Sequence, residues 1–232
     1  MTPALPLWAE HLAVFDTETT GVDTSQARIV SSTIALLGSN GEVLERYDWL
    51  LDPGVEIPSS ASAVHGITTE VARASGVEAP VGIAQILAGV GDMLERGFPV
   101  VIYNAPYDLT LLHAETVRHG LNWPGALSPI VDPLIIDKQL DRYRKGKRTL
   151  TAVAAHYGIG LEAAHDAGED AIAAGRVAQA IARRYGQQLP SDPSELHAAQ
   201  IGWAAAQAEN FQEYMRRVRD PGFVADGAWP HR

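Results

Sequence analysis

The sequence of 232 residues contains no cysteine. Without thiols the chain can form neither a disulfide framework nor a cysteine-ligated zinc or iron–sulfur site. Any metal ion must therefore be held by oxygen atoms or by imidazole nitrogens, and oxygen ligands favour magnesium or manganese. This absence limits the metal chemistry that the remaining residues can support.

Basic side chains and long apolar runs are also scarce. The chain has 18 Lys and Arg against 28 Asp and Glu, so its formal net charge is −10. This charge argues against wrapping nucleic acid through bulk positive charge, because sequence-independent DNA affinity comes mainly from Lys and Arg. No segment approaches the roughly 18 uninterrupted apolar residues of a membrane-spanning helix, and the first residues lack a basic region followed by an apolar run. We therefore expect a cytoplasmic protein that neither spans nor binds a membrane.

The rest of the composition is typical of a folded protein with a sizeable core. Hydrophobic residues make up 46% of the chain and charged residues 20%, which is unlike the composition of disordered chains. At roughly 150 residues per domain, the length fits one domain with an appendage as well as two domains. Residues 187–193 (QQLPSDP) are the clearest boundary. We therefore predict a domain at 1–186 and a C-terminal helical extension at 187–232.

The first third of the chain is expected to form mainly strands. Apolar and β-branched residues gather in three segments, namely 12–16, 28–37 and 42–51. A turn-type sequence at 38–41 (GSNG) joins the last two, so the three segments predict an antiparallel meander. Residues 59–74, around the tripeptide HGI, follow as two short helical turns.

The remainder is expected to be mostly helical. Helical spacing of apolar residues and helix start signals predict helices at 81–96, 104–119, 133–143, 149–157, 166–185 and 194–217. Two short apolar strands, 99–103 and 130–131, interrupt them, and residues 220–232 look irregular. Strands and helices mixed in this order indicate an α/β or α+β layer built on one central sheet.

Asp16 and Glu18 stand at the end of the first apolar strand, within FDTETTG at 15–21. Residues two apart in an extended chain point to one face of the sheet. Two carboxylates there repel each other and are costly to desolvate unless a cation lies between them. Taken alone, the pair also fits a solvated strand end. Other residues are needed to distinguish a cation site from such a surface.

Three further residues join this pair to make a specific set of four acids and one imidazole. Asp108 falls in the first turn of a predicted helix, where the helix dipole by itself favours an acid. His165 and Asp170 flank the start of the alanine-rich helix at 166–185. Five residues of an ideal helix span about 500°, so these two side chains converge only if His165 belongs to the preceding loop. A cap or a satisfied surface histidine is the alternative for His165.

The order of these motifs resembles the DEDDh family of 3′–5′ exonucleases, which includes the proofreading epsilon subunit of bacterial DNA polymerase III, RNase T and oligoribonuclease. FDTETTG at 15–21 is close to the first family motif, NAPYD at 104–108 resembles the second, and HDAGEDA at 165–171 fits the third. HGIT at 65–68 is similar to the segment that these enzymes place beside the terminal nucleotide. The departures are Tyr103 and Tyr107, where many members have histidine and phenylalanine.

The resemblance implies a ribonuclease-H-like exonuclease fold and a site for two Mg²⁺ or Mn²⁺ ions. Two such ions activate water and neutralise the leaving oxygen in phosphodiester hydrolysis. By resemblance Asp16 would bridge both ions, Glu18 and Asp170 would complete the first ion site, and Asp108 would serve the second. His165 would be the general base, with an ordinary pKa near 6.5 that suits proton abstraction near neutral pH.

The same resemblance suggests contacts with the substrate. It places Thr19 near the terminal sugar and His65 and Asn104 near the last nucleotide, and Thr17 belongs to the same group of candidate nucleotide contacts. For each of these residues a local cap or turn hydrogen bond is the alternative role.

A basic run at 142–148 (RYRKGKR) holds five of the 18 basic side chains. A charge run commonly forms a solvated face, but this one lies between the second and third motifs. We expect Arg144, Lys145 and Lys147 to follow the phosphates of a bound strand. The helix at 194–217 carries Trp203, Phe211 and Tyr214, a stripe that fits either packing on its own domain or binding of a partner.

The sequence thus predicts a metal-dependent 3′–5′ exonuclease acting on the 3′ end of nucleic acid. DNA is favoured because FDTETTG and HGIT are closest to the epsilon-like branch, and a polymerase or repair protein is the expected partner. One alternative is an RNA-trimming exoribonuclease of the same fold. The other is a non-catalytic, polymerase-associated nucleic-acid-binding module, whose signature would be a lost acid, and none is lost.

Overall fold

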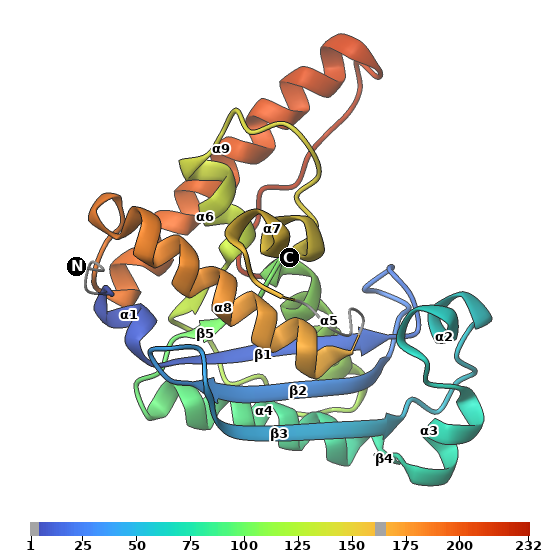
Figure 1. Cartoon of the computed structure of the whole chain (residues 1–232). Helices are drawn as coiled ribbons and strands as arrows, with labels where there is room; N and C mark the ends of the chain where they lie inside the picture. The colour runs from blue at the N-terminus through green and yellow to red at the C-terminus, as the bar shows by residue number, and fades with distance from the viewer. Residues whose placement is uncertain (1–4, 161–165) are drawn as a thin grey trace.

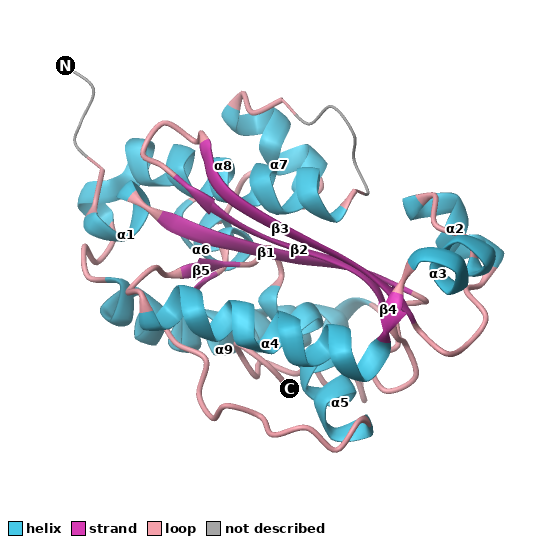
Figure 2. Ribbon diagram, turned by 90° about the horizontal axis from the view of Figure 1, so that it is seen from below, coloured by secondary structure: helices cyan, strands magenta, loops and turns pink. Residues whose placement is uncertain are grey.

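The computed structural model of the chain describes residues 5–160 and 166–232, and shows one mixed β-sheet with helices on both faces (Figures 1 and 2). Within these residues the strands lie in the order β4-β3-β2-β1-β5-β6. Their bounds are β1 Leu12–Thr19, β2 Ile29–Leu37, β3 Val43–Asp52, β4 Val77–Glu78, β5 Val100–Val101 and β6 Ile130–Val131. The first three form the predicted antiparallel meander, and β5 and β6 run parallel to β1.

Most helices of the described residues begin and end close to the predicted positions, whereas the first, Leu7–Glu10, was not predicted. Their bounds are α1 Leu7–Glu10, α2 Ser59–His65, α3 Thr69–Ser75, α4 Ala79–Glu95, α5 Ala105–Arg118, α6 Pro133–Leu140, α7 Leu150–Tyr157, α8 Ala167–Tyr185 and α9 Pro193–Val218. The predicted helix at 133–143 was too long, because the chain turns back after Leu140 and brings Arg144 and Arg148 to Asp137 on α6. None of these helices is both long enough and apolar enough to cross a membrane.

Strand β1 lies at the centre of the protein and is buried on both faces. Leu12 and Val14 belong to the core cluster that contains residues of α8, whereas Ala13 and Phe15 belong to the cluster with residues of α4 and α5. Figure 2 shows α8 on one side of the strands and α4 and α5 on the other. A strand covered on both faces needs apolar residues at successive positions. This explains the apolar run that precedes Asp16.

Helix α8 lies close against β1 and β2. A Cβ atom added at Gly175 would come within 2.5 Å of side-chain carbons of Leu37 and Val14, so this position requires glycine. The close approach brings the first turn of α8 beside the carboxyl end of β1.

Helix α9 packs against α6 and β6, and its C-terminal half extends away from the sheet (Figure 1). Leu196 is fully buried, and Trp203 packs against the core on its own domain. Phe211 and Tyr214 are each 51% exposed. The chain after α9 contains no helix or strand, as predicted. The division into a domain at 1–186 and an extension at 187–232 stays a prediction.

Candidate active site

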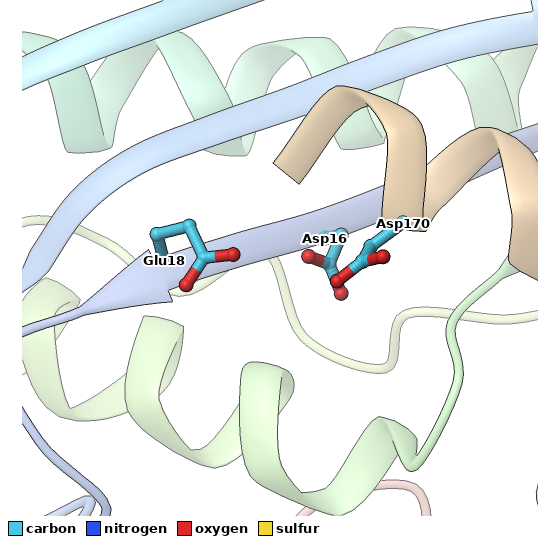
Figure 3. A group of neighbouring side chains, drawn as sticks. All are labelled: Asp16, Glu18 and Asp170. Atoms are coloured by element: carbon cyan, nitrogen blue, oxygen red, sulfur yellow. The ribbon is translucent and has the colours of Figure 1, made fainter. Parts of the chain in front are cut away.

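Three of the predicted acids meet where β1 ends and α8 begins. Asp16 and Glu18 project from β1 toward Asp170 in the first turn of α8 (Figure 3). Each side chain is partly buried, and each offers a carboxylate oxygen within 4.8 Å of the others. Asp166 fixes the start of α8, because its Oδ1 accepts hydrogen bonds from the backbone N–H groups of Gly168 and Glu169. The predicted convergence of acids from distant segments is thus present.

Asp108 reaches the same region from the opposite layer. It lies in the first turn of α5, is buried, and accepts a hydrogen bond of 2.6 Å from Thr17 Oγ1 to its Oδ1. Thr17 stands between Asp16 and Glu18 but points to the other face of β1, toward α5. Thr17, a predicted nucleotide contact, thus donates its hydroxyl to an acid of the site, and this hydrogen bond orients Asp108.

Burial and mutual repulsion perturb the acids strongly. Desolvation, with the charges of Asp108, Asp170 and Glu18, raises the pKa of Asp16 well above its ordinary value. Desolvation and the charges of Asp170 and Asp108 raise the pKa of Glu18 to about 8. Desolvation likewise raises the pKa of Asp108 to about 7, although its bond from Thr17 opposes the shift. Burial and the proximity of these acids therefore make their ionised forms costly.

The donor set fits a divalent metal ion. Carboxylate oxygens are the hard ligands that Mg²⁺ and Mn²⁺ prefer, and a divalent charge would remove the repulsion that raises these pKa values. Asp16, Glu18 and Asp170 would hold such an ion. Strongly perturbed acids gathered from separate elements are typical of functional sites.

The predicted nucleotide contacts Thr19 and His65 both make local bonds. The hydroxyls of Thr19 and Tyr107 lie 2.7 Å apart, and both lie within donating distance of the Gly21 carbonyl, at 2.8 and 2.6 Å. His65 Nδ1 accepts a hydrogen bond from the backbone N–H of Ile67. Burial lowers the pKa of His65, and the nearby Thr19 backbone opposes this shift. His65 and Thr19 are therefore neighbours at the end of β1.

Asn104 occupies the N-cap position of α5 but makes no capping hydrogen bond with its side chain. Its side chain is exposed, and its backbone is left-handed, with φ 65°. In the described ranges it is the one non-glycine residue with positive φ. The exposed side chain stays available for the predicted nucleotide contact.

The basic run is divided between two environments. Arg144 forms ion pairs with Asp137 at 2.5 Å and Asp141 at 3.2 Å, and Arg148 also pairs with Asp137, which is fully buried. These bonds tie the loop to α6, a role for Arg144 that the sequence did not predict. Lys145 and Lys147 are exposed. His165 lies outside the described residues, so its predicted role as general base stays a prediction.

One residue beside the site was missed from the sequence. Asp132 follows β6, is fully buried, and accepts hydrogen bonds from the backbone of the turn that starts α5. A signal was present, since Asp132 directly follows the apolar residues of β6, as Asp16 follows the apolar run within β1.

Residues 13–178 of the chain match the sequence model of a family described as RNase_T, exonuclease. A DNA polymerase III subunit epsilon-like protein of Rhodobacter capsulatus is 32% identical over 175 residues, covering 72% of this chain and 23% of the relative. A DNA polymerase III PolC-type protein of Pediococcus pentosaceus is 26% identical over 162 residues, covering 70% of this chain and 11% of the relative. The chain therefore spans less than a quarter of the length of these curated relatives.

Solved structures share the fold. E. coli exonuclease I in complex with a dT13 oligonucleotide superposes with a TM-score of 0.64 at 19% identity, covering 77% of this chain and 42% of that one. The nuclease domain of 3′hExo, a DEDDh family member bound to rAMP, gives a TM-score of 0.62 at 13% identity, covering 77% of this chain and 92% of that one. These likenesses confirm the predicted exonuclease fold.

Proposed function

The chain belongs to the exonuclease family whose model spans residues 13–178, and from that membership we propose that it is a metal-dependent 3′–5′ exonuclease acting on DNA. The observation that carries the proposal is the cluster of Asp16, Glu18 and Asp170, whose carboxylate oxygens lie within 4.8 Å of one another. All four acids of the family pattern are present, so the signature of a non-catalytic module is missing.

In this proposal Asp16, Glu18 and Asp170 would hold one Mg²⁺ or Mn²⁺ ion, and Asp108 would serve a second together with Asp16. Bound divalent ions supply the charge that activates water and neutralises the leaving oxygen. Thr17 keeps the Asp108 carboxylate directed at the site through its 2.6 Å hydrogen bond. His165 takes the proton of the attacking water, a role that comes from its motif alone.

The 3′-terminal nucleotide is proposed to lie against Thr19, His65 and Asn104. Support comes from contacts that gather these residues. The Thr19 backbone lies beside His65, and the Thr19 hydroxyl contacts Tyr107, whose backbone N–H donates to the Asn104 carbonyl. These contacts link the three candidate residues to one another, and Thr19 is the last residue of the strand β1 that carries Asp16 and Glu18.

DNA is proposed as the substrate because the relatives in sequence are named as DNA polymerase III proteins. A polymerase or repair protein as partner and a cytoplasmic location belong to the same proposal. The exposed Lys145 and Lys147 are proposed to contact phosphates upstream of the cleaved end. Arg144 fixes their loop to α6 through its ion pairs with Asp137 and Asp141, and is proposed to contact phosphate as well.

The test is hydrolysis of single-stranded DNA and RNA of equal sequence, labelled at the 5′ end, with magnesium and with EDTA. The proposal predicts stepwise shortening of DNA from its 3′ end in magnesium only, and none by Asp16→Asn. Glu209→Gln removes one exposed acid from α9 and should behave as wild type. Faster shortening of RNA would assign the enzyme to the exoribonuclease alternative, and no shortening of either would support the non-catalytic module.

A further inference from the structure

Asp132 is a buried carboxylate for which the described residues supply no cation at close range. It is fully buried, and in residues 5–160 and 166–232 no Lys, Arg or His nitrogen lies within 4.0 Å of its carboxylate. Four N–H groups donate to it instead, from the backbones of Asn104, Ala105 and Leu134 and from the indole of Trp229. A buried charge is retained only where such donors replace water, so the arrangement indicates a specific role.

Two of these donors belong to the turn that leads from β5 into α5. The N–H groups of Asn104 and Ala105 each donate at 3.0 Å, one to Oδ1 and the other to Oδ2. Asn104 is in the left-handed conformation, which is unfavourable for most residues other than glycine, although asparagine adopts it more readily than the others. The Asp132 carboxylate holds the chain in this conformation because both oxygens are used at once.

The position of this turn determines the position of Asp108. Asp108 lies four residues after Asn104, one helical turn into α5, and its carboxylate accepts the Thr17 hydroxyl at 2.6 Å. A shift of the turn would move Asp108 away from the other acids. Catalytic groups must be held within about 0.5 Å of productive geometry, so the acceptor that fixes the turn affects the site.

The C-terminal part of the chain closes around the same residue. The open edge of β6 is covered by side chains of α9: His197 Nδ1 accepts from the Ile130 N–H, and Gln200 bonds the Ile130 carbonyl and the Asp132 N–H. Beyond α9, the Trp229 indole donates to Asp132 Oδ2 at 3.4 Å and is 6% exposed. Figure 1 shows this last segment returning from the tip of α9 to the body.

We propose that Asp132 is a positioning residue for the exonuclease reaction, which fixes the turn that places Asp108, and that the C-terminal segment supports it through Trp229. This inference rests on the proposed function, since the position of Asp108 matters only if Asp108 serves the reaction. It gives residues 187–232 a part in building the active site.

The decisive variant is Asp132→Asn, which keeps the shape of the side chain. An amide has one acceptor oxygen and one NH₂ donor, so it would turn a donor toward the N–H of either Asn104 or Ala105. We expect kcat to fall about 10- to 100-fold, the range seen when residues that orient metal ligands are changed. The KM for DNA should change little, and half-maximal activity should need more magnesium.

Glu115→Gln is the matched control. Glu115 is also fully buried and lies on α5, but two turns beyond Asp108, where it pairs with Arg118 and Arg28. Its neutralisation should lower the melting temperature and leave kcat and the magnesium requirement unchanged. Trp229→Phe keeps an aromatic ring and removes one donor, so it should give a smaller loss of kcat than Asp132→Asn.

Amide hydrogen exchange supplies a readout that needs neither metal nor activity. The amides of Asn104 and Ala105 should exchange faster in Asp132→Asn than in wild type, and at the wild-type rate in Glu115→Gln. If wild type is active and Asp132→Asn keeps the full kcat, the inference is overturned. Equal losses of kcat in Asp132→Asn and Glu115→Gln at matched melting temperature would overturn it too. If Asp132→Asn fails to fold, unchanged kcat and exchange in Trp229→Phe would overturn it. An inactive wild type would refute the proposed function instead, and the exchange rates would still report on the turn.

Discussion

Replacing Glu18 by glutamine should stabilise the protein in the absence of metal while removing its activity. Desolvation and the charges of Asp170 and Asp108 raise the pKa of Glu18 to about 8, from an ordinary value of 4.5. Between these two values the folded protein holds a proton that the unfolded chain has released. The contribution of Glu18 to stability is therefore fully present below pH 4.5 and is lost progressively as the pH rises from 4.5 through about 8.

The size of the effect at pH 7 follows from the same pKa values. One pH unit corresponds to about 1.4 kcal/mol, and pH 7 lies 2.5 units above the ordinary value of 4.5, which gives about 3 kcal/mol. Glu18 is partly exposed, so solvent screening reduces the figure to about 1 to 2 kcal/mol. For a chain of this length the gain raises the melting temperature by about 2 to 8 °C.

Thermal unfolding followed by circular dichroism, in EDTA at pH 5.5, 7 and 8.5, measures this gain. The difference between Glu18→Gln and wild type should grow with pH, because wild type alone loses stability through this group. Glu209→Gln, which removes an exposed acid far from the cluster in sequence, should show no such difference. Saturating magnesium should stabilise wild type more than Glu18→Gln, because an ion that binds only the folded state adds to its stability. A Glu18→Gln variant that melts at or below the wild-type temperature in EDTA at pH 7 would refute the reasoning.

Other predictions concern residues with separate roles. Asp170→Asn should abolish release of mononucleotides while circular dichroism stays unchanged, and residual activity above a tenth of wild type would argue against a ligand role. His165→Ala should lower kcat much more than it raises KM, measured by steady-state kinetics, whereas equal changes in both would contradict a general base. Changing Lys145 and Lys147 together to alanine should weaken DNA binding and flatten its dependence on salt, measured by fluorescence anisotropy, and an unchanged slope would remove them from the interface.

Much of the fold was predictable because its signals are local. The apolar run that ends at Asp16, the turn at 38–41 and the helical spacing in α4 and α8 each depend on neighbouring residues. Short elements such as β4 at Val77–Glu78 were missed, because two exposed residues carry no periodic pattern. The predicted end of α6 was also wrong, since the observed end depends on ion pairs between Asp137 and arginines later in the chain.

The acids of the site were predictable for a different reason. Asp16 and Glu18 are two residues apart on one strand, and Asp108 and Asp170 each stand in a helix start. What could not be predicted is how the acids are supported. The bond from Thr17 to Asp108 joins opposite layers of the fold, and it exists only once α5 packs on β1.

The basic run and the C-terminal helix show the same limit. Composition predicted a charged loop at 142–148, but it could not separate Arg144, which pairs with buried Asp137, from the exposed Lys145. The helix at 194–217 was predicted from its spacing. Its use of Gln200 to complete the edge of β6 depends on a contact between residues 70 positions apart.

The central claim is that the carboxylate cluster holds divalent ions that allow hydrolysis from a free 3′ end. Its most direct test compares two 5′-labelled single-stranded DNAs of equal sequence, one with a free 3′ hydroxyl and one with the 3′ end blocked, in magnesium and in EDTA. We predict successive one-nucleotide shortening of the free strand in magnesium, with the blocked strand and the EDTA samples intact. Internal cleavage of the blocked strand, or shortening that persists in EDTA, would contradict it.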